Sequence, residues 1–155
     1  MRRWVASLCL AAALGAAGCA DDSKGRPAAT IPVHYVYAAS DSNGAAAAAG
    51  TLEIVYHPAS DDDPGVMIAS ITGYWSIAAI SDSVDAGWQA GEGVLEGGVY
   101  SDRGLEINLH PGVADRSTLL NGLFDGSLYG SFSGVWGDAG IGGVQRHGTY
   151  AAQKT

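Results

Sequence analysis

The chain has 155 residues, with 16 Asp and Glu against 8 Lys and Arg, and a formal net charge of −8. This length suits one domain. The acidic balance argues against nucleic acid or anionic lipid as partners, because both are bound through clustered basic side chains. The 23 glycines disfavour helices.

The N-terminal segment has the three parts of a secretory signal peptide. Arg2-Arg3 is a basic start, Trp4 to Leu14 is a short apolar stretch, and the small residues 15–18 follow. The apolar stretch is too short to span a bilayer as a helix of the mature protein. The sequence therefore predicts a signal peptide over residues 1–18.

The run Ala16-Ala17-Gly18-Cys19 resembles the lipobox of bacterial lipoproteins, whose cysteine is acylated and becomes the new N-terminus. The family usually has leucine where Ala16 stands, which leaves cleavage after Ala20 as an alternative. The only other cysteine, Cys9, lies in the signal, so acylation would account for an otherwise odd thiol. The resemblance implies fatty acylation of Cys19, including palmitate, and a lipid anchor in a membrane. Because Ala20 rather than Asp follows, it favours the outer over the inner membrane.

The polar residues 19–30 predict a flexible tether, and a single domain is expected over 31–155. In this domain short alternating runs are separated by glycine-rich turns, which is typical of strands. Asp125-Gly126 predicts a two-residue hairpin turn, Gly104 is expected to adopt a left-handed conformation in another hairpin, and the alanine run 45–49 is interpreted as loop. Eight strands are expected, near 32–38, 51–57, 66–78, 92–100, 104–110, 118–124, 127–136 and 144–152.

Short sequential strands predict an all-β fold, a meandering antiparallel β-barrel of about eight strands, with a sandwich as the alternative. The arrangement resembles the small calycin-type barrels, the avidin-like and lipocalin-like group. Gly73-Tyr74-Trp75 is similar to the Gly-x-Trp motif of lipocalins, which implies Arg146 as the partner of Trp75. In that family, however, the motif lies on the first strand, whereas here it falls on the third predicted strand.

Alternation also predicts which side chains point into the barrel. We expect a mostly filled interior and a minor apolar pocket beside Gly73, Gly130 and Gly134, because an eight-stranded barrel leaves room for at most one small ligand. Trp75, Phe132 and Trp136 are the candidate pocket residues. The predicted inward set is Leu52, Ile54, Ile71, Trp75, Ile77, Leu105, Ile107, Leu109, Phe124, Phe132 and Trp136.

Residues 52–58 and 105–111 form a weak repeat, since Leu-Glu-Ile and then His-Pro occur in both. Either a duplicated half-barrel or recurrent strand-ending chemistry, which we favour, would produce it. In a meander, His57 and His110 would lie at opposite ends of the barrel. We therefore expect no shared metal ion.

No motif for catalysis, cofactor or metal binding is complete. Residues 91–97 miss a dinucleotide-binding loop by one position, and residues 130–134 place Phe132 where a hydrolase motif needs serine. The four histidines are not paired at ligand spacing, and Asp61-Asp62-Asp63 is interpreted as a solvated loop. We expect neither cofactor nor metal.

These observations predict a non-enzymatic cell-envelope lipoprotein with a structural or binding role. Its partners would be the membrane, through the anchor on Cys19, and another envelope protein. The alternatives are a calycin-type carrier of a small apolar ligand and an enzyme of unrecognised type.

Overall fold

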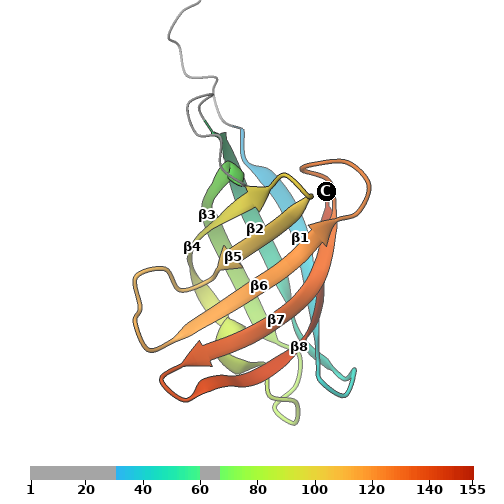
Figure 1. The fold of residues 1–155 in the computed structure, drawn as a ribbon. Helices are drawn as coiled ribbons and strands as arrows, with labels where there is room; N and C mark the ends of the chain where they lie inside the picture. The colour runs from blue at the N-terminus through green and yellow to red at the C-terminus, as the bar shows by residue number, and fades with distance from the viewer. Residues whose placement is uncertain (1–30, 60–66) are drawn as a thin grey trace, which may run out of the picture.

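The computed structural model describes residues 31–59 and 67–155. The predicted signal peptide, Cys19, the tether over 19–30 and the run Asp61–Asp63 lie outside these residues. The described chain forms a closed antiparallel barrel in which each strand pairs with the next and the last pairs with the first (Figure 1). The predicted all-β meandering barrel is confirmed, and its architecture is compatible with the calycin-type barrels.

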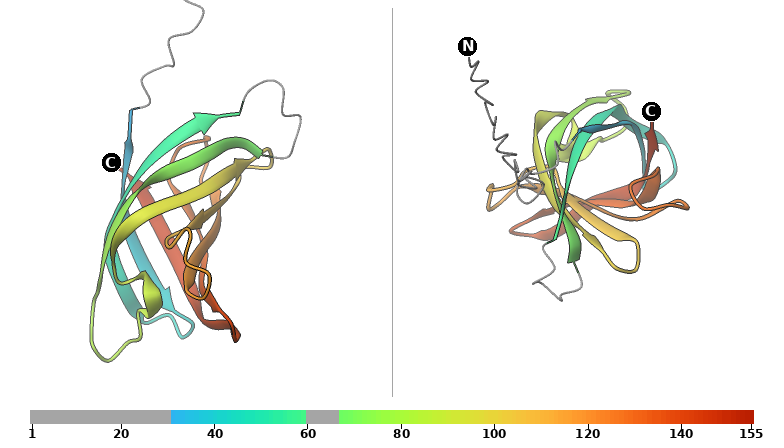
Figure 2. Two further views of the ribbon diagram at one scale, coloured as in Figure 1. Left: turned by 90° about the vertical axis from the view of Figure 1, so that its left-hand side faces the viewer. Right: turned by 90° about the horizontal axis from the view of Figure 1, so that it is seen from above.

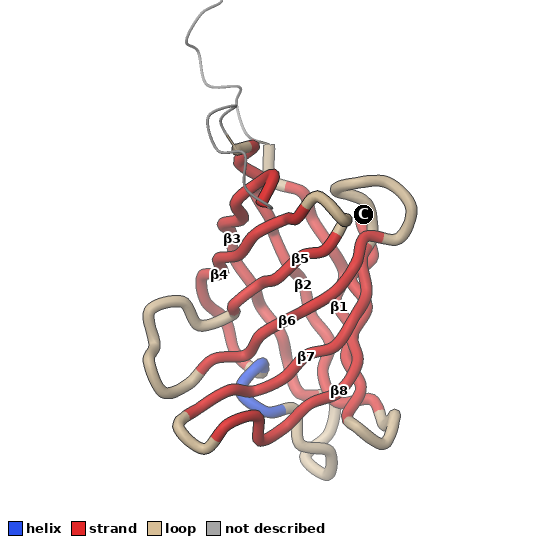
Figure 3. Tube along the Cα trace, in the orientation of Figure 1, coloured by secondary structure: helices blue, strands red, loops and turns tan. Residues whose placement is uncertain are grey.

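The barrel has two differently covered ends. We call the end where β1 begins and β8 ends the mouth, and the opposite end, where the short 3-10 turn η1 lies, the floor (Figure 3). At the mouth, the backbone nitrogen of Thr155 donates to the carbonyl of His34 at 3.1 Å, so the two ends of the domain are adjacent (Figure 2). The elements are β1 (Val33–Asp41), β2 (Ala46–Pro58), β3 (Met67–Ala79), η1 (Gly87–Gln89), β4 (Gly91–Tyr100), β5 (Gly104–Asn108), β6 (Ser117–Phe124), β7 (Phe132–Gly140) and β8 (Gly143–Lys154).

The interior is filled by side chains that alternate along the strands. All eleven side chains predicted to point inward are at most 3% exposed, so the predicted faces are confirmed. Four tyrosines from β1, β2 and β8 share the interior with them: Tyr35, Tyr37, Tyr56 and Tyr150. A closed sheet with a full interior needs no further layer to bury its apolar face.

Glycines allow neighbouring strands of this narrow barrel to approach closely. A β-carbon added to Gly73 of β3 would overlap the carbonyl oxygen of Glu53 on β2, and one added to Gly134 of β7 would overlap that of Asn121 on β6. Both glycines begin a Gly-x-Trp sequence. The same local requirement therefore occurs on two strands that lie four apart in the barrel.

The tryptophans of the two Gly-x-Trp sequences also occupy equivalent places. Trp75 lies opposite Gly93 of β4, and its indole Nε1 donates to the carbonyl of Leu109 at 2.7 Å, beyond the end of β5. Trp136 lies in the same way opposite Gly148 of β8. Each indole thus crosses a glycine on the next strand, where a side chain would block it.

Four local expectations were wrong. The two-residue hairpin turn expected at Asp125-Gly126 is instead the start of the longer connection 125–131, because β6 ends at Phe124 and β7 begins only at Phe132. Residues 46–49 of the alanine run belong to β2, because β1 and β3 on either side supply ladder hydrogen bonds and Ala47 and Ala48 are fully buried. β7 begins at Phe132 rather than at 127, so Gly130 lies in the connection 125–131 and not on an inward face. In the β4–β5 hairpin the left-handed residue is Arg103, with φ 69°, rather than Gly104.

Candidate functional site: the mouth and floor of the barrel

The connection 125–131, which we call the mouth loop, lies at the rim of the mouth beside the C-terminus (Figure 1). The ring of Tyr129 lies 4.5 Å from that of Tyr56 and 6.1 Å from that of Phe124, measured between centroids. The carbonyl oxygen of Tyr129 accepts hydrogen bonds from the hydroxyl of Tyr35 at 3.2 Å and from Nζ of Lys154 at 3.1 Å. Tyr129 therefore covers the interior with its ring and is held through its backbone.

Two hydroxyl groups lie directly beneath Tyr129. The hydroxyls of Tyr35 and Tyr56 are 2.8 Å apart. Because the single hydroxyl hydrogen of Tyr35 is directed to the Tyr129 carbonyl, Tyr56 is the donor within the pair. Burial raises the pKa of both phenols, and for Tyr56 the hydrogen bond to Tyr35 raises the pKa further. Both groups are neutral at physiological pH and act as donors.

The floor is covered by η1, which lies between β3 and β4 (Figure 3). Gln89 of η1 is fully buried, and its Oε1 accepts a 2.6 Å hydrogen bond from the hydroxyl of Tyr37. Its Nε2 and the hydroxyl of Tyr150 are buried without a partner among the described residues. Burial raises the pKa of Tyr37 and Tyr150, so these hydroxyls are also neutral.

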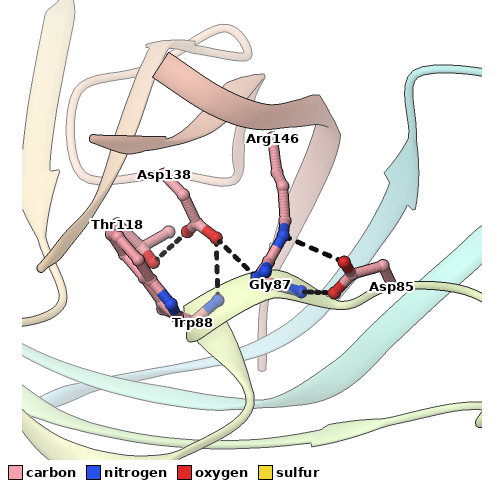
Figure 4. Close-up of polar contacts among 6 residues, drawn as sticks. All are labelled: Asp85, Gly87, Trp88, Thr118, Asp138 and Arg146. Atoms are coloured by element: carbon pink, nitrogen blue, oxygen red, sulfur yellow. Dashed lines mark hydrogen bonds and ion pairs between the residues drawn. The ribbon is translucent and has the colours of Figure 1, made fainter. Parts of the chain in front are cut away.

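A buried carboxylate fixes η1 to the barrel wall (Figure 4). Asp138 of β7 is 1% exposed and accepts hydrogen bonds from Thr118 Oγ1 at 2.6 Å and from the backbone nitrogen of Trp88 at 2.8 Å. Arg146 of β8 lies 3.6 Å from the same carboxylate through Nη1, while its Nε lies 2.9 Å from Asp85. Strands β6, β7 and β8 are thereby joined to η1 through one side chain.

Replacing Asp138 with alanine is expected to lower the free energy of unfolding by about 2 kcal/mol, since hydrogen bonds to a buried charged group are lost and their donors stay buried. Chemical denaturation followed by circular dichroism measures this change. The control is Asp85→Asn, because that side chain is 68% exposed and surface ion pairs contribute at most about 1 kcal/mol. Equal losses in the two variants would contradict the role given to Asp138.

The three candidate pocket residues lie in different surroundings. Trp75 borders an open hollow of about 510 Å³ on the outer wall of β1 to β4, beside the exposed Tyr74. Trp136 borders a more apolar hollow on the outer wall of β6 to β8. Phe132 is fully buried near the mouth, against Tyr35. The structure does not bring the three together, and their role in ligand binding stays a prediction.

The contact between Trp75 and Arg146 that the lipocalin resemblance implies is replaced by other contacts. Arg146 is engaged by Asp85 and Asp138, as described above. The Trp75 ring packs edge-on against His110, with 5.3 Å between centroids. Since the Gly-x-Trp sequence lies on β3 rather than on the first strand, the lipocalin pairing does not carry over.

The two histidines of the weak repeat lie at the ends of strands that run in opposite directions. His57 is near the mouth end of β2, where its Nε2 hydrogen-bonds Thr72 at 2.7 Å, whereas His110 follows β5, which runs away from the mouth. Their placement at opposite ends of the barrel stays a prediction. Burial and, less strongly, the charge of Arg116 lower the pKa of His110. Within residues 31–59 and 67–155, no group of three or more His, Cys, Asp or Glu could hold a metal ion. The absence of a shared metal stays a prediction.

Several residues at the two ends escaped the sequence analysis. Period-two spacing could have placed Tyr35 and Tyr37 on one inward face, and Asp138 on the same face as Trp136. No pattern marks Tyr129, because its position depends on the conformation of a loop.

Comparison of the chain with protein-family models, curated proteins and solved structures finds no significant match. The described part of the chain contains no helix with the length and apolar character needed to cross a membrane. The functional argument therefore starts from the chemistry of the residues at the two ends of the barrel.

Proposed function

We propose that this chain is a non-enzymatic lipoprotein of the cell envelope, acylated on Cys19 and attached to a membrane, preferentially the outer one. Its barrel would serve a structural or binding role. The observation that carries the proposal is the filled barrel, whose ends are covered by the mouth loop and by η1. Such a domain buries its own apolar face without a further layer and can serve as a scaffold. The predicted signal peptide would direct the chain to the envelope, and the lipobox-like sequence would attach it to a membrane.

The buried polar groups support a role other than catalysis. General acids and bases work best when their pKa lies near the working pH. Burial instead raises the pKa of the interior tyrosines. The Asp138 carboxylate already accepts hydrogen bonds from Thr118 and Trp88 and forms an ion pair with Arg146. These groups stabilise the closed barrel and are poorly suited to proton transfer.

The anchor is tested by Cys19→Ser. We expect this variant to move from the membrane fraction to the soluble fraction, because the acylated thiol is lost. Cys9→Ser is the matched control, since that cysteine lies in the predicted signal peptide and its loss should leave attachment unchanged. Mass spectrometry of the mature protein checks the modification directly. An unmodified N-terminus at Asp21 would refute the lipoprotein proposal.

A second candidate function is the carriage of a small apolar ligand. The observation that favours it is the group of aromatic rings at the mouth, where Tyr129 of the mouth loop packs against Tyr56 and Phe124. Phe124 packs in turn against Phe132. Small-molecule sites combine such apolar walls with a few placed polar groups. Here the polar groups are the hydroxyls of Tyr35 and Tyr56.

A further inference from the structure

We propose that the mouth of the barrel is a binding site for small aromatic compounds in which a two-carbon linker joins the ring to a carbonyl group. Tyr129 occupies this site when the mouth loop is closed. The inference rests on the binding role proposed above and names its site and its ligand class. It follows from three features of the mouth: the contacts of the Tyr129 ring, the donors to its carbonyl, and the backbone of the loop.

The ring of Tyr129 fills an aromatic site built by other parts of the chain. Its neighbours are Tyr56 of β2 and Phe124 of β6, which is in turn in contact with Phe132 of β7. These rings belong to the barrel, so they stay in place when the loop moves. Aromatic pairs in offset or edge-on arrangements contribute roughly 0.5–1.5 kcal/mol beyond area burial. A ligand ring can replace the Tyr129 ring without loss of these contacts.

The polar contacts of Tyr129 define what else the ligand must offer. The Tyr35 hydroxyl and Lys154 Nζ both donate to the Tyr129 carbonyl. If the loop leaves, the Tyr35 hydroxyl loses the Tyr129 carbonyl as its acceptor. A ligand carbonyl at this position would restore the hydrogen bond, which contributes roughly 0.5–1.5 kcal/mol net. In tyrosine the carbonyl is two carbons from the ring. A 3-arylpropanoyl compound reproduces this spacing, and a carboxylate form would also pair with Lys154.

The mouth loop is built to release Tyr129 while its base stays fixed. At the base, the backbone nitrogen of Asp125 donates to the carbonyl of Ser131 at 2.8 Å. At the tip, Tyr129 has φ 61°, a left-handed conformation that costs a residue with a β-carbon roughly 1–2 kcal/mol. Leu128 beside it is 40% exposed. The strain opposes the closed conformation, so ligand binding has to replace only the contacts of one residue.

The proposal is tested with 3-(4-hydroxyphenyl)propanamide, added to the purified full chain and followed by calorimetry and by backbone amide NMR. We expect the wild-type chain to bind it, with shift changes at residues 125–131 and faster hydrogen exchange of the amides of residues 126–130, while the Asp125 amide at the fixed base of the loop keeps its protection. Tyr129→Gly removes the competing ring and the strained conformation, so we expect about tenfold tighter binding or more. Tyr74→Gly is the control, because that tyrosine lies on the outer wall of β3 and is 64% exposed.

The donor requirement is tested by adding Tyr35→Phe to Tyr129→Gly, which should weaken binding of the amide about tenfold. Binding to Tyr129→Gly alone, with no shift changes in the wild-type loop at saturating compound, would mean an engineered cavity only and would overturn the proposal. Absence of binding to both proteins would also overturn it. The wild-type NMR experiment tests the proposal even if the variants fail to fold. None of these outcomes affects the Cys19→Ser test.

Discussion

Replacing Trp136 with alanine is expected to lower the free energy of unfolding by roughly 3–5 kcal/mol, the range for truncation of a buried tryptophan. The side chain is 1% exposed. Its indole crosses Gly148 of β8, and Nε1 donates to the carbonyl of Ser40 on β1 at 2.9 Å. The substitution therefore leaves a cavity and removes a contact that joins β7 to β1. Urea denaturation followed by circular dichroism measures the loss.

The matched control for this prediction is Val135→Ala, one residue earlier on β7. Val135 points outward and is 55% exposed, and surface substitutions of this kind change stability by about 0.5 kcal/mol or less. Similar losses in the two variants would show that the inward and outward faces of β7 are misassigned.

The second large effect is expected for Gly134→Ala. The added β-carbon would overlap the Asn121 carbonyl oxygen and lie 2.5 Å from the α-carbon of Gly122, both on β6. These are backbone atoms, so the strands must separate, and we expect destabilisation by about 3 kcal/mol, the upper end of the range for overpacking. Thermal unfolding followed by circular dichroism measures it.

Two comparisons make the glycine prediction specific. Gly73→Ala should cost a similar amount, because its β-carbon would meet the Glu53 carbonyl in the same way. Ser133→Ala, beside Gly134 on β7, adds no atoms and should cost much less. If both glycine variants were as stable as the wild type, the close approach of these strands would be refuted.

The fold was predictable because the signal for it is local. Period-two alternation depends on the pleat of each strand, so the inward faces followed from the sequence alone. The turns were less predictable. Arg103 adopts a left-handed conformation beside Gly104, whose backbone nitrogen is bound by Asp102 Oδ1 at 2.9 Å. Asp125-Gly126 opens a longer loop than a two-residue hairpin, although Gly126 has the expected positive φ of 87°.

Most of the candidate site could not be predicted from the sequence, because its residues are far apart in the chain and come into contact only when the barrel closes. Asp138 contacts Thr118 and Trp88, which lie 20 and 50 residues away in the sequence. Tyr35 and Tyr129 are separated by 94 residues. Hydrophobic alternation assigns each side chain to a face of its own strand, but it cannot identify such polar partners, because they belong to other strands and loops.

The positions of residues 52–58 and 105–111 in the barrel do not fit a duplicated half-barrel as the origin of the weak repeat. Its copies lie on β2 and β5, three strands apart and running in opposite directions. A duplicated half would relate strands four apart, which run in the same direction. This geometry supports recurrent strand-ending chemistry for the repeat. The Gly-x-Trp pairs of β3 and β7, by contrast, do have the four-strand relation.

The pairing of β1 with β8 imposes an order on folding. The other seven pairings join strands that are consecutive in the chain, so each can form as a local hairpin. The eighth joins the two ends of the domain, Tyr35 opposite Lys154, and bears the loop-closure entropy of the whole barrel. Until it forms, β1 and β8 are open edges able to pair with other chains. We therefore expect the chain to be most prone to aggregation just before the ring closes.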